Sequence, residues 1–367
     1  MRAFSTLVCA ALACAGLSGC NGGSSGGDDD TGTGTGTDVD ADGDADGDTD
    51  SDGDTDGDAG GDTDGDTDTD GDADGDTDTD GDADGDSDGD GDTDTSTDPG
   101  AGLVGTWGEL GVTAVIAKNV PILGQQWSST RSWLLVQIAS DGAGHLTATE
   151  KACMTKIKVG GATGTKVSIP QSTIDHMKPT ERLVTVTSSA PGTAFQSDIV
   201  YDVAGVNLCD PVNDPLPAAL SAQPNDSTPC SGACTGGQCD QDEDGHPGVT
   251  SKITGLLSCS IYAAVRGWSR LDGSVADADT ISGAITDCGS EQSLLAASSQ
   301  LCKDQSSSTI EDDACAKHHY FKMVRLADGA TCADVLALTD CDEAEGTCDN
   351  NTVQPLDPTN DKASDCP

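Results

Sequence analysis

Residues 28–98 form a tract that cannot build a hydrophobic core. Asp alternates there with Gly, Thr, Ala and Ser, and the tract contains 32 Asp but no Lys, Arg or Glu. Such residues bury too little apolar surface to offset the entropy of ordering, and like charges at every second position repel. We therefore expect a disordered, extended stalk with a span on the order of 50 Å, from ~5–6 Å × √n. A folded domain can begin only after it.

Short repeats within the tract have a second interpretation. The segments 70–75 and 80–85 both read Asp-Gly-Asp-Ala-Asp-Gly. They resemble the D-x-D-x-D-G core of calcium loops in EF-hands, dockerins and thrombospondin type 3 repeats, where alternate carboxylates converge on one cation. No Glu stands at the twelfth position, unlike in an EF-hand. Ordered calcium sites and a solvated spacer therefore both stay open, and the spacer is our prediction.

The N-terminus indicates export. Arg2 precedes an apolar run from Ala3 to Leu17, which is too short for a spanning helix and is typical of a secretory signal. The run ends in Leu17-Ser18-Gly19-Cys20, which resembles the lipobox of bacterial lipoproteins. The resemblance implies acylation of Cys20 as the first mature residue. With Asn21 rather than Asp following, it also implies sorting to the outer membrane, where acyl chains would anchor the protein.

The charge of the chain argues against nucleic-acid partners. The formal net charge is −48, from 65 acidic and 17 basic residues. Without the 32 Asp of the tract and without Arg2, 33 acids and 16 bases remain, so the rest carries about −17. Binding to phosphate backbones requires a basic face. We therefore expect the membrane, reached through the lipid anchor, and an unknown surface ligand as the partners.

Cysteine is abundant after the tract. Removing residues 1–19 takes away two of the 16 cysteines, the lipobox resemblance implies that Cys20 would carry lipid, and 13 remain. An exported chain with so many cysteines is predicted to form disulfides, and the odd number leaves one thiol free, buried or paired between chains. The run Cys230-x3-Cys234-x4-Cys239 could suggest zinc. No fitting fourth ligand accompanies it, so disulfides are our interpretation here too.

The remaining chain alternates apolar and polar residues in short segments that are divided by Gly, Asp and Pro. This pattern predicts a mainly β fold. We expect an antiparallel barrel or sandwich with one or two short helices. We expect a turn at Leu271–Ser274, a helix within 291–303, a last strand at His319–Leu326, and a helix capped by Thr331 and ending at Leu338. The predicted divisions are a signal peptide (1–19), lipidated stalk (20–100), β domain (101–340) with a Cys/Pro-rich insertion (209–247), and an acidic tail (341–367).

Gly105-x-Trp107 opens the first strand of this domain. It resembles the G-x-W motif of lipocalins and the wider calycin group. That resemblance implies an eight-stranded ligand-binding barrel in which Trp107 closes one end and a late Arg packs on it, a role for which Arg325 is available. An unspecified barrel or sandwich with Trp107 in its core is the alternative.

The segment Asp240-Gln241-Asp242-Glu243-Asp244-Gly245-His246 again resembles a D-x-D-x-D-G calcium loop. Ser251 stands where an EF-hand has its Glu, so a thrombospondin-type or hairpin loop fits better. The predicted Ca²⁺ ligands are Asp240, Asp242, Asp244 and His246. A solvated acidic turn is the alternative.

Catalytic motifs are scarce. The chain has five His, and no nucleophile elbow, His-Glu-x-x-His helix, P-loop or dinucleotide fingerprint is present. On a strand, His318 and His319 would point to opposite faces, so at most one would join a site. We predict a lipid-anchored surface protein with a non-catalytic β domain that binds a ligand or partner. A calcium-stiffened structural or adhesive protein is the first alternative. A secreted hydrolase, which would show converging carboxylates or a His–acid pair in a cleft, is the second.

Overall fold

The computed structural model describes residues 98–120, 124–160, 164–231, 233–255, 258–303, 309–341 and 354–359. The signal peptide, Cys20, the tract up to residue 97 and most of the tail lie outside these ranges, so the calls made on them stay predictions. Twelve strands of the described part form one antiparallel sheet, joined by short helices. The prediction of a mainly β domain is confirmed. Within the same ranges, no helix has the length and apolar character needed to cross a membrane.

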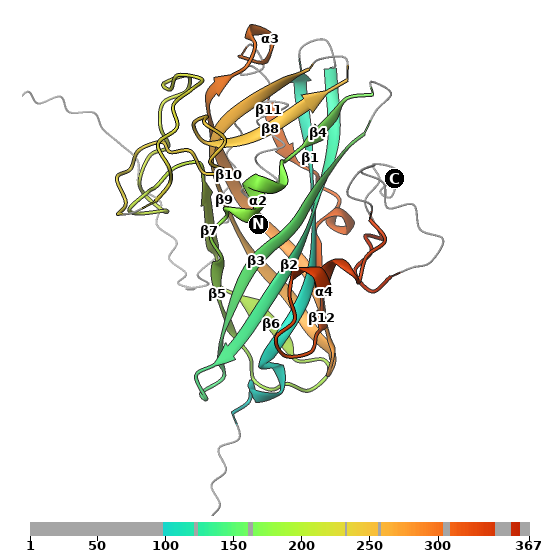
Figure 1. Cartoon of the computed structure of the whole chain (residues 1–367). Coiled ribbons are helices and arrows are strands. Elements are labelled where there is room, and N and C mark those ends of the chain that lie inside the picture. Colours follow the sequence, from blue (N-terminus) through green and yellow to red (C-terminus); the bar gives the residue numbers. More distant parts are fainter. Residues whose placement is uncertain are drawn as a thin grey trace, which may run out of the picture. The chain divides into compact units, whose positions relative to one another are not determined.

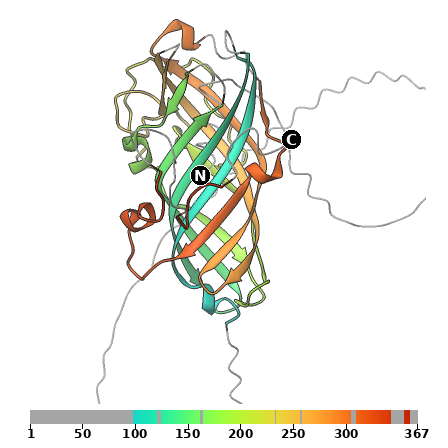
Figure 2. The same ribbon diagram turned by 90° about the vertical axis from the view of Figure 1, so that its right-hand side faces the viewer.

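Eight of these strands close into a ring, so of the two expected architectures the barrel is the one observed. Strand β10 completes the ring by pairing with β9 along most of its length. Figures 1 and 2 show these long strands tilted around a common axis. Closure leaves the ring without a free edge. The order around the ring is β1 (Gly105–Val120), β2 (Gly124–Ser140), β3 (His145–Val159), β5 (Thr180–Thr185), β6 (Ala194–Ser197), β9 (Cys259–Asp277), β10 (Thr280–Ala297) and β12 (Tyr320–Arg325).

Strands β4, β8 and β11 extend the sheet at one end of the ring, the upper end in Figure 1, and β7 lies beside the middle of β9. Strands β6, β7 and β8 pair with successive stretches of the same edge of β9, and β4 pairs with β8. Strand β11 pairs with the end of β1. These strands are β4 (Lys166–Ser168), β7 (Val200–Ala204), β8 (Val249–Thr254) and β11 (Thr309–Asp312), and the helices are η1 (Ala101–Leu103), α2 (Gln171–Asp175), α3 (Gln300–Lys303), η3 (Ala316–His318) and α4 (Cys332–Leu336).

Trp107 lies at the opposite end of the barrel and is fully buried. Its indole nitrogen donates to the carbonyl of Leu103, 3.0 Å away, so the ring is held against η1. Arg325 of β12 is its partner in the strand register, and the guanidinium carbon lies 4.2 Å from the centre of the indole ring. Arg325 also donates to the carbonyls of Val104 and Gly102. The contact expected between the late Arg and Trp107 is therefore present.

Alternation along the strands divides the barrel interior into three zones. An apolar cluster around Trp107 fills one end, and a second cluster around Val115, Ile261 and Val265 fills the other. Between them, β1 presents Glu109, Gly111 and Thr113 on the same face as Trp107, because side chains alternate with a period of two. The middle of the barrel is therefore polar.

The outward face of β1–β3 is also buried in part. Helix α4 packs there, and the disulfide Cys153–Cys332 joins it to β3. Trp133, which faces away from the interior, is covered in this way, and its indole nitrogen donates to the carbonyl of Leu356 at 3.0 Å. Thr331 caps α4 in a capping box with Asp334, which confirms the predicted cap, although the helix ends at Leu336.

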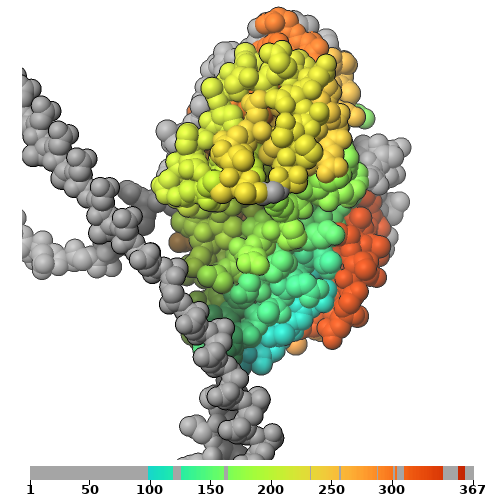
Figure 3. Space-filling view, turned by 60° about the vertical axis from the view of Figure 1, so that its left-hand side comes forward, coloured from blue at the N-terminus to red at the C-terminus, as the bar shows by residue number. Residues whose placement is uncertain are grey.

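The insertion at 209–247 packs on the outward face of β9 and β10. Apolar residues of this region, with Leu208 and Ala222 among them, cluster with Ala264 and Leu295 of these strands. Arg266 of β9 donates to the carbonyls of Pro211 and Asp214 at 3.0 and 2.7 Å. Figure 3 shows the insertion, in yellow, as a continuous layer over the upper part of this face. The barrel thus supplies the apolar support that the loop lacks by itself.

Disulfides hold the insertion and the barrel ends, as predicted. Cys209–Cys234 and Cys230–Cys239 lie within the insertion, so its three closely spaced cysteines are engaged in disulfides, and Cys259–Cys302 joins β9 to α3. All eleven cysteines in the described ranges are disulfide-bonded. The prediction of one unpaired thiol concerns cysteines outside these ranges and stays a prediction.

Two predictions of local structure in strands β9 and β10 were wrong. The expected turn at Leu271–Ser274 lies inside β9, and the chain turns instead between Asp277 and Thr280. The expected helix within 291–303 is strand up to Ala297, and only Gln300–Lys303 is helical. Residues 290–297 pair with Gly267–Ile261 of β9, and these long-range hydrogen bonds outweigh the local helical spacing.

Candidate functional site

The acidic loop Asp240–Gly245 lies between the disulfide Cys230–Cys239 and strand β8. Backbone hydrogen bonds close its base, from Gly248 to the carbonyl of Cys239 and from Gln241 to that of Gly248. Gly245 has φ +88°, a left-handed conformation that favours glycine. The loop is therefore held by a covalent bond on one side and by the sheet on the other.

The structure brings together three of the four predicted ligands. Asp240, Asp242 and Asp244 each offer an oxygen atom, and these atoms lie within 4.8 Å of one another. Asp240 and Asp242 are buried, whereas Asp244 is exposed, so solvent reaches the cluster from one side. Three carboxylates this close repel one another unless a proton or a cation is shared among them.

Hydrogen bonds orient the three carboxylates. Gly245 donates its backbone N–H to Asp240 at 2.9 Å. Oδ2 of Asp242 accepts from the Thr173 hydroxyl of α2 at 2.7 Å and from the Thr250 N–H of β8 at 2.9 Å. The Thr250 hydroxyl donates to Asp244 at 2.8 Å. The cluster thus connects α2, the insertion and β8.

One oxygen of the cluster has no partner. Oδ1 of Asp242 is buried and makes no hydrogen bond among the described residues. Burial raises the pKa of Asp242, and the adjacent Asp240 adds to this rise against the hydrogen bonds from Thr173 and Thr250. A buried, unpartnered carboxylate oxygen is unfavourable in free energy. A hard cation, which takes carboxylate oxygens as ligands, would remove this cost.

His246 is not part of the carboxylate group. Its Nδ1 contacts the carbonyl of Pro224, and its ring stacks on Tyr262 with centroids 4.3 Å apart. Only its backbone N–H reaches the cluster, where it donates to Asp244 at 3.0 Å. Ser251, at the position of the EF-hand Glu, is buried on β8 opposite Ile261. The loop thus departs from an EF-hand, as the sequence indicates.

His318 and His319 form a second polar cluster, and the expectation that they lie on one strand was wrong. His318 ends η3, His319 follows it, and both contact Asp313, through Oδ2 at 2.6 Å and through the backbone carbonyl at 2.7 Å. Trp127 also donates to Oδ2 of Asp313 at 2.6 Å. Burial acts to raise the pKa of Asp313, but these hydrogen bonds and one from the Cys315 N–H lower it. The short helix overrides the strand alternation assumed for these histidines.

This His–acid pair lacks the next member of a hydrolytic triad. His318 is buried, and its Nε2 has no hydrogen-bond partner in the described ranges. A groove of about 270 Å³ lies beside the pair, lined by Thr286, Asp312, Asp313 and His319 among others. Nucleophilic catalysis requires a hydroxyl or thiol within hydrogen-bond reach of the base. The described part of the chain places none at Nε2 of His318.

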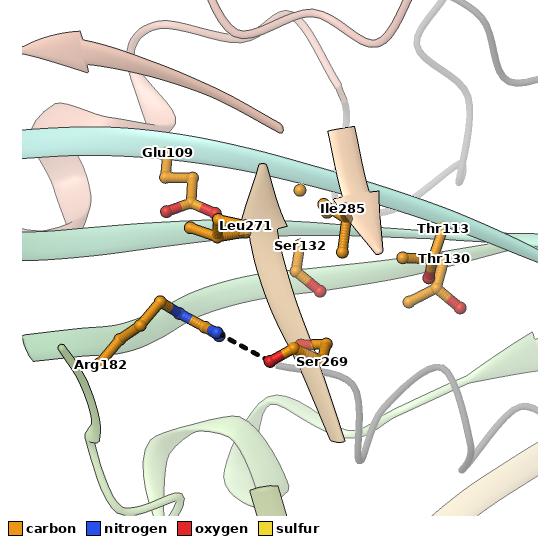
Figure 4. A pocket seen from close by; sticks show the side chains of 9 residues that line it. Glu109, Thr113, Thr130, Ser132, Arg182, Ser269, Leu271 and Ile285 are labelled. Atoms are coloured by element: carbon orange, nitrogen blue, oxygen red, sulfur yellow. Dashed lines mark hydrogen bonds between the residues drawn. The ribbon is translucent and has the colours of Figure 1, made fainter. Parts of the chain in front are cut away.

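The polar middle of the barrel contains residues that sequence reasoning missed. Arg182 of β5 donates through Nε to Glu150 of β3 at 2.8 Å, and the side chains of both are 2% exposed. Glu109 of β1 is fully buried close to this pair. A cavity of about 20 Å³ adjoins Glu109 and Arg182 (Figure 4). The only signal in the sequence is a charged residue at an inward position of an alternating strand.

The size of this cavity can be compared with the ligand that the calycin resemblance led us to expect inside the barrel. About 20 Å³ is room for one water molecule and not for an organic ligand. Apolar clusters fill the barrel on both sides of it. Comparison with protein-family models, with curated proteins and with solved structures finds no match in any of the three. Inferences about function therefore depend on the sites of this chain alone.

Proposed function

We propose that this protein is a lipid-anchored protein of the cell envelope that presents a calcium-stabilised, non-catalytic β domain to an external partner. The observation that carries the proposal is the convergence of Asp240, Asp242 and Asp244, with a buried oxygen of Asp242 that has no hydrogen-bond partner among the described residues. Export and anchoring are supported by the resemblance of Leu17–Cys20 to a lipobox, and the distance from the membrane by the acidic tract.

Calcium suits this cluster better than zinc. Its ligands are oxygen atoms, and flexible geometry allows carboxylates, carbonyls and water to be mixed. Zinc prefers nitrogen and sulfur ligands, and His246 is engaged with Pro224 and Tyr262. Sites of extracellular proteins bind calcium with dissociation constants of about 10⁻⁴–10⁻³ M. A bound ion would hold together α2, the insertion and β8, because Thr173 and Thr250 already contact the ligands.

The test is calorimetric titration of calcium into the purified mature chain, combined with thermal melting. We expect binding heat and a higher Tm in calcium, with both lost in Asp242→Asn. Glu243→Gln is the matched control, because Glu243 belongs to the same loop but its side chain is 60% exposed and outside the cluster. The acidic tract is the same in all variants, so any ion that it binds contributes equally to each titration. Equal heats for wild type and Asp242→Asn would contradict the proposal.

The proposed partner contacts the outer surface of the domain, since the cavity described inside the barrel, beside Glu109 and Arg182, has room for one water molecule and not for an organic ligand. Anchoring is tested separately, by metabolic labelling with a fatty acid and by fractionation of cells that express wild type or Cys20→Ala. We expect label and membrane association for wild type only. Label on the Cys20→Ala variant would show that the lipid is attached elsewhere.

A secreted hydrolase is the second candidate, because one observation favours it: Asp313 and His318 form a His–acid pair beside a groove of about 270 Å³. A panel of ester and glycoside substrates tests it. Activity that disappears in His318→Gln would replace the non-catalytic proposal. Activity that persists in this variant would point to a different site or to a contaminant.

A further inference from the structure

The polar middle of the barrel contains one charge pair that is complete. Arg182 donates to both carboxylate oxygens of Glu150, at 2.8 and 3.3 Å. Its third nitrogen donates to the carbonyl of Ser269 at 3.2 Å and to the hydroxyl of Ser197 at 3.4 Å. Every nitrogen of the guanidinium group is therefore engaged, and its charge is balanced by Glu150.

Glu109 is a second buried acid in this part of the barrel, and it lies outside the Arg182–Glu150 pair. It has no solvent exposure, and neither of its carboxylate oxygens makes a hydrogen bond in the described part of the chain. Burial raises the pKa of Glu109 well above the usual value, and the nearby Glu150 adds to this, while Arg182 opposes it. Buried polar side chains almost always have a partner. Whether charged or protonated, the carboxyl group of Glu109 needs one that the described residues do not supply.

The space beside Glu109 fits such a partner. The cavity there measures about 20 Å³, which is room for one water-sized species. The inward position of Gly111 leaves this space free of a side chain. The hydroxyl-bearing residues Thr113, Thr130, Ser132 and Ser269 also line it. Figure 4 shows the Glu109 carboxylate beside Leu271 and the Arg182 guanidinium turned to Ser269.

The charges of the side chains around the cavity determine which kind of ion fits there. An anion would face both Glu109 and Glu150, with Arg182 already committed to Glu150. A divalent cation takes six or more oxygen ligands, usually with several carboxylates, and only one carboxylate here is unpaired. A single positive charge balances Glu109. A carboxylate with surrounding hydroxyl oxygens is a ligand set for a hard ion of water-like size.

A groove on the side of the barrel, next to the inner cavity, carries negative charges that attract a cation. The groove beside η3 is lined by Asp312 and Asp313, and Ile285 of β10 lines both this groove and the inner cavity. The Ile285 side chain therefore separates the two spaces. An approaching cation would pass carboxylates outside before it met Glu109 inside.

We propose that the cavity at Glu109 binds one small monovalent cation, such as potassium, sodium or ammonium, inside the barrel. The site is separate from the Asp240–Asp244 cluster, and it stands or falls independently of the proposed function. Bound cation would couple the stability of the barrel to the monovalent ions of its surroundings.

The first test is thermal melting of the full mature chain at pH 8 with a calcium chelator. The chlorides of potassium, sodium, ammonium and tetramethylammonium are compared at equal ionic strength, because tetramethylammonium is too large for the cavity. We expect at least one small cation to raise Tm by several degrees over tetramethylammonium. Glu109→Gln, of equal size, should lose this difference, and Asp242→Asn should retain it. Equal Tm in all four salts, or the same difference in Glu109→Gln, would overturn the proposal.

The second test needs no variant. Crystals of the wild-type chain grown in rubidium or thallium salts are examined by anomalous scattering. We expect a peak within coordinating distance of the Glu109 carboxylate. Density for a water molecule without an anomalous signal at this position would mean that the cavity is merely hydrated, and would also overturn the proposal.

Discussion

The guanidinium carbon of Arg325 lies 4.2 Å above the indole ring of Trp107, and the two residues are also paired in the register of β1 and β12. Arg325 thereby joins the last strand of the ring to the first. Its hydrogen bonds to the carbonyls of Val104, Gly102 and Ala278 tie the turn before β10 and the η1 segment to the same group. One side chain thus links both ends of the folded domain at one end of the barrel.

Replacing Arg325 with Gln should lower the free energy of unfolding by about 2 kcal/mol, because a cation–π contact and charged hydrogen bonds are lost together. Chemical denaturation followed by tryptophan fluorescence measures this change. Arg270→Gln is the control, since the Arg270 side chain is 42% exposed and pairs with Asp272 at the surface. Similar losses in the two variants would contradict a special role for Arg325.

Glu109 should make the barrel less stable as pH rises. Its folded-state pKa is raised by burial and by Glu150, so the folded chain binds more protons than the unfolded chain above the unfolded pKa of about 4.3. The contribution of Glu109 to the free energy of unfolding should therefore be fully present below that pH. Above it, this contribution should decline by at most about 1.4 kcal/mol per pH unit. Denaturation curves between pH 4.5 and 8 in tetramethylammonium chloride measure this, and Glu109→Gln should flatten the decline.

Asp313 should make the folded domain less stable as pH falls, whereas Glu109 makes it less stable as pH rises. Hydrogen bonds from Cys315, His318 and Trp127 lower its pKa despite burial, so the folded chain favours the charged form. Its contribution is present above the unfolded pKa of about 3.9 and disappears as pH falls through the folded value. Asp313→Asn should cost about 1–2 kcal/mol at pH 7 and less near pH 3. A cost that does not change with pH would contradict this assignment.

The disulfide Cys230–Cys239 should tighten calcium binding, because it ends at the residue before Asp240 and limits the motion of the loop in the free state. Replacing both cysteines with Ala should weaken the calcium affinity by about tenfold, or roughly 1.4 kcal/mol. The Cys209–Cys234 pair, also in the insertion but with neither cysteine adjacent to any of the three Asp, is the matched control. Calorimetric titration compares the two double variants.

Ile285→Ala should widen the inner cavity toward the side groove, because this side chain lines both. We expect a loss of about 2–4 kcal/mol in stability, as for other buried Ile. Methylammonium should then stabilise the variant, although it does not fit the wild type. Ile281→Ala, from the same apolar cluster but outside the lining of either space, should show the loss without the new selectivity.

Sequence reasoning predicted the parts of this fold that have short-range signals. Gly105-x-Trp107 indicated the first strand, Thr331 indicated the cap of α4, and the spacing of Asp240, Asp242 and Asp244 indicated a common carboxylate site. It failed at 291–303, where a helical spacing lies within a strand, and at His318, where a single helical turn replaces the expected strand. In both cases contacts with distant segments outweigh the local preference.

By itself, the sequence indicated that residues 28–98 offer too little apolar surface for a core, that the distal cysteines form disulfides, and that the distal domain is built from strands. Those conclusions depend on composition and on the period of two along one segment. Only the tertiary structure decided that β10 closes the ring on β9, that Arg182 pairs with Glu150, and that Glu109 is buried without a hydrogen-bond partner among the described residues. Burial and pairing depend on contacts between strands that are far apart in the chain. The local sequence around an acid that faces the barrel interior therefore looks the same as the local sequence around an acid that faces outward.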